Sequence, residues 1–199
     1  SSAATIALGI EAAARWQGRP LELERKLAIA LQLESHADNL AAALAGGACL
    51  TWREGGRHRV ARLARDLPLQ PIAVSPPDRV ATAASRGRLP FVLAHEQAAV
   101  AASRAALLGA ALAAGDADLL RASFDDVLHE PYRMEDSPLL QELRAEGATL
   151  SGSGPTVIVW VEPAEAAARA AELERRFPDA TVRVLAVAEG AKAEEVARA

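Results

Sequence analysis

Several residue types are scarce in this chain of 199 residues, and each scarcity excludes a class of site. Cys49 is the only cysteine, which rules out an internal disulfide and a cysteine-rich zinc centre and fits a reducing cytoplasm. Lys26 and Lys192 are the only lysines, and neither follows a G-x-x-x-x-G-K-[ST] loop, which excludes a P-loop nucleotide site. Aromatic residues make up 4% of the chain, too few for platforms that stack single-stranded nucleic acid.

An excess of positive charge and long apolar runs are also lacking. The formal net charge is −4, which argues against a general nucleic-acid binder. The N-terminus has no basic region followed by an apolar core, so we expect a cytoplasmic protein. The most apolar segment, about 98–114, is mostly alanine and carries Arg104 near its middle, so we expect a buried or half-buried helix and no membrane span.

Hydrophobic patterning predicts a mixture of helices and strands. Helices are expected at about 1–17, 22–32, 94–115, 116–128 and 165–176, and strands at 50–52, 57–63, 71–75, 157–161 and 181–188. From Ser137 onwards the order helix–strand–helix–strand predicts an α+β layer with its helices on one face of the sheet. The tail 189–199 is expected to form a short helix or to fray.

A glycine-rich turn stands before the apolar run 157–161, with the sequence Leu150-Ser151-Gly152-Ser153-Gly154-Pro155-Thr156. Glycines on both sides of a serine allow positive φ and a close approach to a ligand. Successive exposed N–H groups in such a turn form a small anion-binding concavity. A plain reversal of the chain explains the same residues, so both interpretations stay open on local grounds.

Three further segments carry polar groups that invite two interpretations. Ser1 and Ser2 open the first expected helix, either as an ordinary cap or as an anion site at its N-terminus. The run Glu34-Ser35-His36-Ala37-Asp38-Asn39 is either a structural histidine with a capping pair, or a loop that binds metal, phosphate or an amino acid. The run His129-Glu130-Pro131-Tyr132-Arg133 is either a helix exit stopped by proline or part of a site.

In their order and spacing these segments resemble the GHMP small-molecule kinases, and within them the homoserine kinases. Ser1-Ser2-Ala3-Ala4 is similar to the end of the family's Gly-Leu-Gly-Ser-Ser-Ala-Ala phosphate loop, and Gly147 to Thr156 resembles its last motif. The segments that point to homoserine kinases are the run from Glu34 to Gly47, Arg86 with Leu89-Pro90, and the run from His129 to Arg133.

The resemblance implies an α+β protein with the GHMP kinase two-domain fold, N-terminally truncated and ending in a ferredoxin-like α/β layer. Residues 1–68 would be the remainder of the ATP-binding N-terminal domain, and residues 69–199 the C-terminal domain. The implied reaction is ATP-dependent phosphorylation of the L-homoserine side-chain hydroxyl, giving O-phospho-L-homoserine and ADP in threonine biosynthesis.

The resemblance also implies the role of each site residue. ATP is assigned to Ser1, Ser2, Ala3, Ser153 and Gly154, Mg²⁺ to Ser2 and Glu34, and the substrate to His36, Asp38, Arg86, Arg133 and Gly152. Mg²⁺ prefers hard oxygen ligands, and guanidinium groups match a substrate carboxylate. Asp38 and Asn39 are the catalytic candidates. Because an amide cannot act as a general base, Asn39 favours direct attack by the hydroxyl, with its proton passing to phosphate or solvent.

Two alternatives remain from the sequence. One is another GHMP kinase that acts on a different small alcohol, and the other is a non-catalytic truncated fragment. Since the family's N-terminal segment has no counterpart before Ser1, we expect a chain that is inactive alone, either as a fragment or because another chain supplies the missing part. The expected partner is a small-molecule substrate, with no nucleic acid and no membrane, and a homodimer is left open.

Overall fold

The structure, a computed structural model, describes residues 2–77 and 87–192. Two compact units divide the chain, Ser1–Leu67 with Val187–Ala199 and Pro68–Ala186. The sequence predicted a boundary after residue 68 and one C-terminal domain from there to the end. The units differ from that division at the tail, because the segment from Val187 belongs with the first unit. The roles assigned to the two domains stay predictions.

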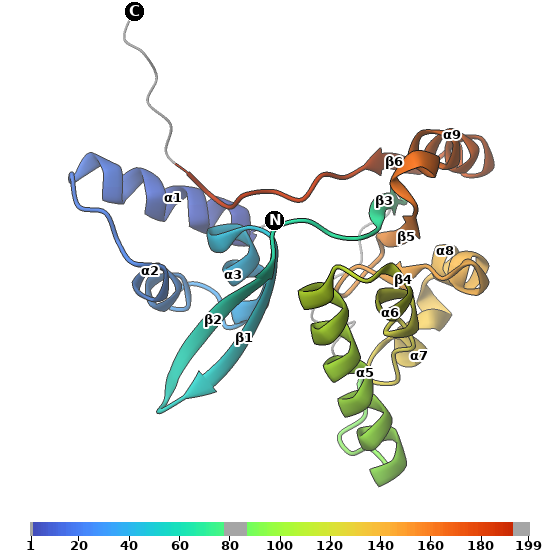
Figure 1. Cartoon of the computed structure of the whole chain (residues 1–199), viewed down its shortest axis with the longest axis horizontal. Coiled ribbons are helices and arrows are strands. Elements are labelled where there is room, and N and C mark those ends of the chain that lie inside the picture. Colours follow the sequence, from blue (N-terminus) through green and yellow to red (C-terminus); the bar gives the residue numbers. More distant parts are fainter. Residues whose placement is uncertain (1, 78–86, 193–199) are drawn as a thin grey trace, which may run out of the picture. The chain divides into compact units, whose positions relative to one another are not determined.

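The first unit packs three helices beside a β-hairpin (Figure 1). Its elements are α1 (Ser2–Trp16), α2 (Leu23–Ala30), α3 (Ala37–Ala45), β1 (Ala48–Glu54) and β2 (Arg57–Ala64). Helical spacing puts four apolar residues of α1 on one buried face, Ala3, Ala7, Ile10 and Ala14. They share a core with Leu27, Leu40 and Leu44 of the other two helices. This core positions the start of α1 and the start of α3, where the predicted site residues lie.

The tail of the chain is extended over 185–192, not helical, and the last strand ends at Val184. The prediction of a strand to Ala188 is therefore wrong. Of the two alternatives for the tail from Glu189, a short helix or a frayed end, the helix is absent over 189–192. Long-range contacts decide this conformation. The Gly47 N–H donates to the Ala188 carbonyl at 2.8 Å, and the Ala191 N–H donates to the Ala43 carbonyl at 2.8 Å. The end of α3 thus holds the tail by backbone hydrogen bonds that no local pattern reports.

The second unit is built on an antiparallel sheet with the strand order β4-β5-β3-β6. The strands are β3 (Gln70–Ser75), β4 (Thr149–Leu150), β5 (Val157–Val161) and β6 (Thr181–Val184). Alternation along β5 buries Val157, Val159 and Val161 on one face. Leu143 of α8 (Pro138–Leu143) and Leu173 of α9 (Ala166–Arg176) pack against that face. The prediction of helices on one face of the sheet is confirmed.

The remaining helices of this unit are shorter or more exposed than predicted. They are α5 (His95–Ala114), α6 (Ala117–Ala122) and α7 (Glu130–Arg133), and single 3₁₀ turns lie at Met134–Asp136, Arg144–Glu146 and Pro163–Glu165. The prediction of a helix to residue 128 is wrong, because α6 ends at Ala122. The Ser123 hydroxyl donates to the Leu120 carbonyl at 2.7 Å, and Asp126 organises a turn beyond it.

Helix α5 corrects a second prediction, since Ala111 is its only buried residue and most of its length is exposed. Its alanines are too short to reach a core, and it contacts α6 near its C-terminal end. By length and composition alone, α5 is the one helix in 2–77 and 87–192 that could cross a membrane. This is weak evidence, because core helices of soluble proteins and signal sequences have the same length and composition.

Candidate active site

Ser2 and Glu34, the two predicted metal ligands, lie together in the first unit. The Ser2 hydroxyl donates to Glu34 Oε2 at 3.4 Å, and Glu34 Oε1 accepts from the Ser35 N–H at 3.0 Å. Across the described ranges no group of three or more His, Cys, Asp or Glu side chains forms a metal cluster. A hydroxyl and a carboxylate fit Mg²⁺, which takes phosphate oxygens and water as its other ligands.

The N-terminus of α1 is suited to a phosphate. The described helix begins at Ser2, and its first turn contains no acidic residue. Backbone N–H groups in a first turn lack partners inside the helix, and the helix dipole favours an anion there. Ala3 is 3% exposed and packs in the core, so its backbone is the only part suited to a ligand. Ser1, predicted beside them, lies outside the described residues.

His36, Asp38 and Asn39 lie at the start of α3. His36 is extended, with φ −113° and ψ 124°, and precedes the helix. Asp38 and Asn39 occupy its first turn, where Asp38 Oδ1 accepts from the Asn39 N–H at 2.8 Å. All three residues are exposed, because the buried Leu40 faces the opposite side of the helix. They are accessible to a ligand, and their roles stay predictions.

The glycine-rich loop of the second unit is closed by its own hydrogen bonds. The Ser151 N–H donates to the Thr156 carbonyl at 2.9 Å, and the Gly154 N–H donates to the Ser151 carbonyl at 2.9 Å. Gly152 and Gly154 have φ of 58° and 76°, which L side chains rarely adopt, and the Gly154–Pro155 bond is cis. The Thr156 and Ser75 hydroxyls lie 2.9 Å apart and tie the loop to β3.

Arg133 and Gly152, predicted separately to bind the substrate, are in direct contact. Arg133 is 9% exposed, and its Nη1 donates to the Gly152 carbonyl at 2.9 Å. The same nitrogen lies 3.2 Å from His129 Nδ1. A hollow of about 10 Å³, the size of one water, lies between Arg133, Ser153 and Gly154. Arg86, the second predicted arginine, lies outside the described residues.

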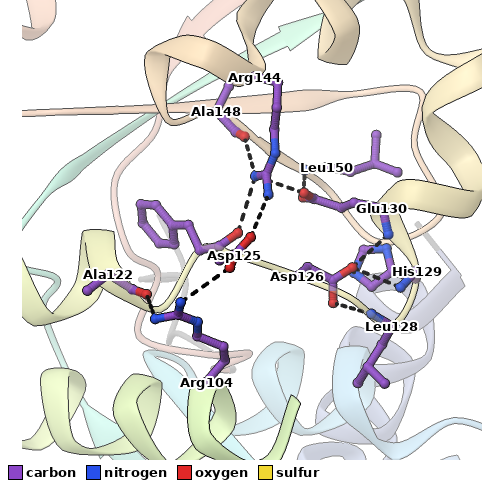
Figure 2. A network of polar contacts seen from close by, with 11 residues as sticks. Arg104, Ala122, Asp125, Asp126, Leu128, His129, Glu130, Arg144, Ala148 and Leu150 are labelled. Carbon is purple, nitrogen blue, oxygen red and sulfur yellow. Dashed lines mark hydrogen bonds and ion pairs between the residues drawn. The ribbon is translucent and has the colours of Figure 1, made fainter. Parts of the chain in front are cut away.

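A buried polar network adjoins the loop (Figure 2). Glu130 is 2% exposed; its Oε1 accepts from the Leu150 N–H at 2.6 Å, and its Oε2 lies 3.0 Å from Arg144 Nη1. Burial raises the pKa of Glu130, although the Leu150 N–H and Arg144 act in the opposite direction. Arg144 Nη1 also donates to the Phe124 and Ala148 carbonyls at 3.2 and 3.3 Å.

Asp126 fixes the start of α7. Its Oδ2 accepts from the N–H groups of His129 and Glu130 at 2.8 and 2.6 Å, and its Oδ1 accepts from the Leu128 N–H at 3.2 Å. Burial alone would raise the pKa of Asp126, but these donors and the nearby His129 hold it below its ordinary value. The carboxylate therefore stays ionised and caps the turn that carries Glu130 and Arg133.

Sequence reasoning did not select the three residues of this network, Asp126, Glu130 and Arg144. A signal existed for Glu130, since it stands within the polar run from His129 to Arg133 and beside Pro131, which favours a helix start. Arg144 lies far from Glu130 in the sequence, and nothing local distinguishes it from other arginines on expected helices. Its pairing follows from the packing of the second unit alone.

Comparison with known proteins supports the resemblance. Residues 97–179 match the family model described as GHMP kinases C terminal. The chain is 40% identical over 176 residues to a homoserine kinase of Streptomyces avermitilis, covering 83% of this chain, and 37% identical over 196 residues to one of Moorella thermoacetica, covering 94%. The structure resembles the crystal structure of homoserine kinase from Cytophaga hutchinsonii with a TM-score of 0.86 at 26% identity, over 96% of this chain and 66% of that one.

The chain spans 57% and 66% of the lengths of these two relatives. The match over 94% of the chain includes residues of both units. The α+β fold expected from the sequence is confirmed by these structural likenesses. The chain belongs to the GHMP kinases and is similar to the homoserine kinases among them.

Proposed function

We propose that the protein containing this chain phosphorylates the side-chain hydroxyl of L-homoserine with ATP. The products are O-phospho-L-homoserine and ADP, and the reaction belongs to threonine biosynthesis. The observation that carries the proposal is the 40% identity to a homoserine kinase over 83% of the chain. The contact between Arg133 and Gly152 supports it, because it unites two residues assigned to one substrate.

On the nucleotide side, the proposal uses the first turn of α1 and the glycine-rich loop. Their N–H groups supply positive partial charge for phosphates without a lysine, which suits a chain with few lysines. Ser2 and Glu34 hold Mg²⁺, and the bound ion neutralises phosphate charge. Ser153 and Gly154 contact ATP, and Gly152 contacts the substrate.

On the substrate side, Arg133 and Arg86 bind the α-carboxylate through their guanidinium groups. Asp38 and His36 orient the ammonium and hydroxyl ends. The hydroxyl oxygen forms a bond to the γ-phosphorus while the bond from that phosphorus to the ADP oxygen breaks. The hydroxyl proton passes to a phosphate oxygen or to solvent, because Asn39 supplies no base. Asp38 and Asn39 contribute by positioning.

We place this reaction in the cytoplasm, which fits the single cysteine. The proposed partner is a small molecule, and a homodimer stays a prediction.

The test is ADP release by the natural gene product that contains this sequence. L-homoserine, mevalonate and galactose are offered separately with Mg-ATP. The proposal expects activity with homoserine, and Arg133→Ala is expected to raise the KM for homoserine by about 10- to 100-fold, as for loss of a charge-assisted hydrogen bond. Arg121→Ala is the matched control, because Arg121 pairs on the surface with Asp118 and Glu162. Activity with mevalonate or galactose alone would overturn the substrate and favour another GHMP kinase.

A further inference from the structure

We propose that Glu130 is a positioning residue for the glycine-rich loop, holding it at Leu150 while Arg133 holds it at Gly152. The inference rests on the proposed function in one respect, that the loop supplies the N–H groups that contact ATP and substrate. Glu130 itself touches neither. It acts through the backbone of the loop, and Arg144 in turn holds its carboxylate.

The two contacts come from one turn of helix. Glu130 and Arg133 are the first and last residues of α7, and residues three apart in a helix project from the same face. Glu130 accepts from the Leu150 N–H at 2.6 Å, and Arg133 donates to the Gly152 carbonyl at 2.9 Å. A carboxylate thus meets a backbone donor and a guanidinium meets a backbone acceptor two residues further on. The position of α7 therefore sets the position of the loop.

The Leu150 N–H is buried and therefore requires a hydrogen-bond acceptor. Leu150 is 7% exposed, so its N–H has little access to water and needs an acceptor within the protein. Glu130 provides that acceptor, and hydrogen bonds to a charged group are stronger than neutral ones. Without the carboxylate, the loop would have to move to satisfy the Leu150 N–H.

Arg144 fixes the carboxylate from the side of β4. It contacts Glu130 Oε2 at 3.0 Å and donates to the carbonyl of Ala148, which immediately precedes β4. Asp126 fixes the other end by capping the start of α7. Figure 2 shows Glu130 between Arg144 and Asp126. This support on both sides is what a positioning residue requires.

The first test needs no activity. Hydrogen exchange at the Leu150 amide is compared between the wild-type protein, Glu130→Ala and Glu130→Gln, with no nucleotide added. The inference predicts that exchange is at least about 10-fold faster in Glu130→Ala and intermediate in Glu130→Gln, whose amide oxygen still accepts a hydrogen bond. Unchanged exchange at Leu150 in Glu130→Ala would overturn the inference.

The second test measures homoserine phosphorylation by the same variants. Glu130→Ala is expected to lower kcat by about 10- to 100-fold with a smaller change in KM, because misplaced loop amides affect the transferred phosphoryl group most. Glu130→Gln is expected to recover most of that loss. Leu173→Ala controls for stability, since Leu173 of α9 is fully buried in the core cluster that also includes Leu150. Glu142→Ala controls for loss of a carboxylate, since Glu142 pairs with Arg176 on the surface.

The outcomes separate the two proposals. If the wild-type protein phosphorylates none of the alcohols offered, the proposed function fails, and the exchange experiment still decides whether Glu130 holds the loop. If the wild-type protein is active and folded Glu130→Ala keeps its kcat, the positioning role is wrong. It is also wrong if Leu173→Ala or Glu142→Ala loses as much kcat as Glu130→Ala.

Discussion

Replacing Arg144 with alanine isolates the buried charge of Glu130. Glu130 is 2% exposed, and it forms an ion pair with Arg144, whose side chain is 26% exposed. Arg144→Ala leaves the carboxylate with the Leu150 N–H as its remaining polar contact. The variant also removes hydrogen bonds to the Phe124 and Ala148 carbonyls and an ion pair at 3.8 Å with Asp125, which is exposed and also pairs with Arg104.

The size of the effect follows from these contacts. Breaking a fully buried ion pair by removing one partner costs about 3–5 kcal/mol. Because water reaches the partly exposed site of Arg144, we expect a loss of about 2–3 kcal/mol in the free energy of unfolding near neutral pH. Burial already raises the pKa of Glu130, and the loss of Arg144 raises it further.

This pKa sets the sign of the pH dependence. At acidic pH Glu130 is protonated in both states, so the missing ion pair no longer matters. The loss caused by Arg144→Ala should then fall to about 1 kcal/mol, the contribution of the backbone hydrogen bonds. As pH rises through the pKa of folded Glu130, the loss should grow to its full value.

Urea unfolding followed from about pH 4, below the ordinary pKa of glutamate, to about pH 7.5 measures the loss on both sides of the raised pKa. Arg104→Ala is the matched control, because Arg104 likewise donates to a backbone carbonyl, that of Ala122, and pairs with Asp125 without contacting Glu130. The loss in the free energy of unfolding caused by Arg104→Ala should be smaller and nearly independent of pH. A loss for Arg144→Ala below about 1 kcal/mol near neutral pH, or one that does not change with pH, would refute the reasoning.

Three further changes have expected outcomes. Asp126→Ala should cost about 1–2 kcal/mol near neutral pH and progressively less as pH falls through the lowered pKa of Asp126, measured by urea unfolding against pH. Gly46→Ala should destabilise more than Gly152→Ala in thermal unfolding. Both glycines have positive φ, but only a Cβ at Gly46 would collide with backbone atoms, those of Glu189 and Gly190. Leu173→Ala should cost about 2–5 kcal/mol in urea unfolding, since Leu173 is fully buried. Equal losses of stability for the two glycine variants, or no loss for the Asp126 or Leu173 variant, would contradict these expectations.

Local patterns predicted the elements whose conformation is decided locally. The strand Val157–Val161 has the bounds that its apolar run indicates, and the hairpin turns at Gly55 and Gly56 as their conformational freedom allows. The end of α6 and the extended tail were missed for the opposite reason. Asp126 redirects the chain after α6 by capping α7, and the tail is held by hydrogen bonds to the end of α3. Neither contact leaves a periodic signal in the sequence.

The candidate site was predicted from the family resemblance, and the roles of its residues stay predictions. Glu34 and Ser2 were selected as metal ligands, and the structure brings them within 3.4 Å. The contact of Arg133 with Gly152 was not predicted, although both residues were assigned to the substrate. Glu130 was not selected, because in the sequence it is one residue of a polar segment that is also explained by the end of a helix. Its burial and its partners are known only from the structure. The sequence shows which residue types are present, whereas their burial and their partners depend on the fold.

The measurement that tests the central claim most directly is transfer of the γ-phosphoryl group of ATP to L-homoserine, compared with its methyl ester. The natural gene product containing this sequence is incubated with each alcohol and Mg-ATP, and the phosphorylated product is identified by ³¹P NMR. Because the proposed arginines bind a free α-carboxylate, we predict a phosphomonoester from L-homoserine and at least about 10-fold slower transfer to the ester. Equal transfer to both alcohols, or none to homoserine by a folded protein that transfers phosphate to another alcohol, would contradict the account.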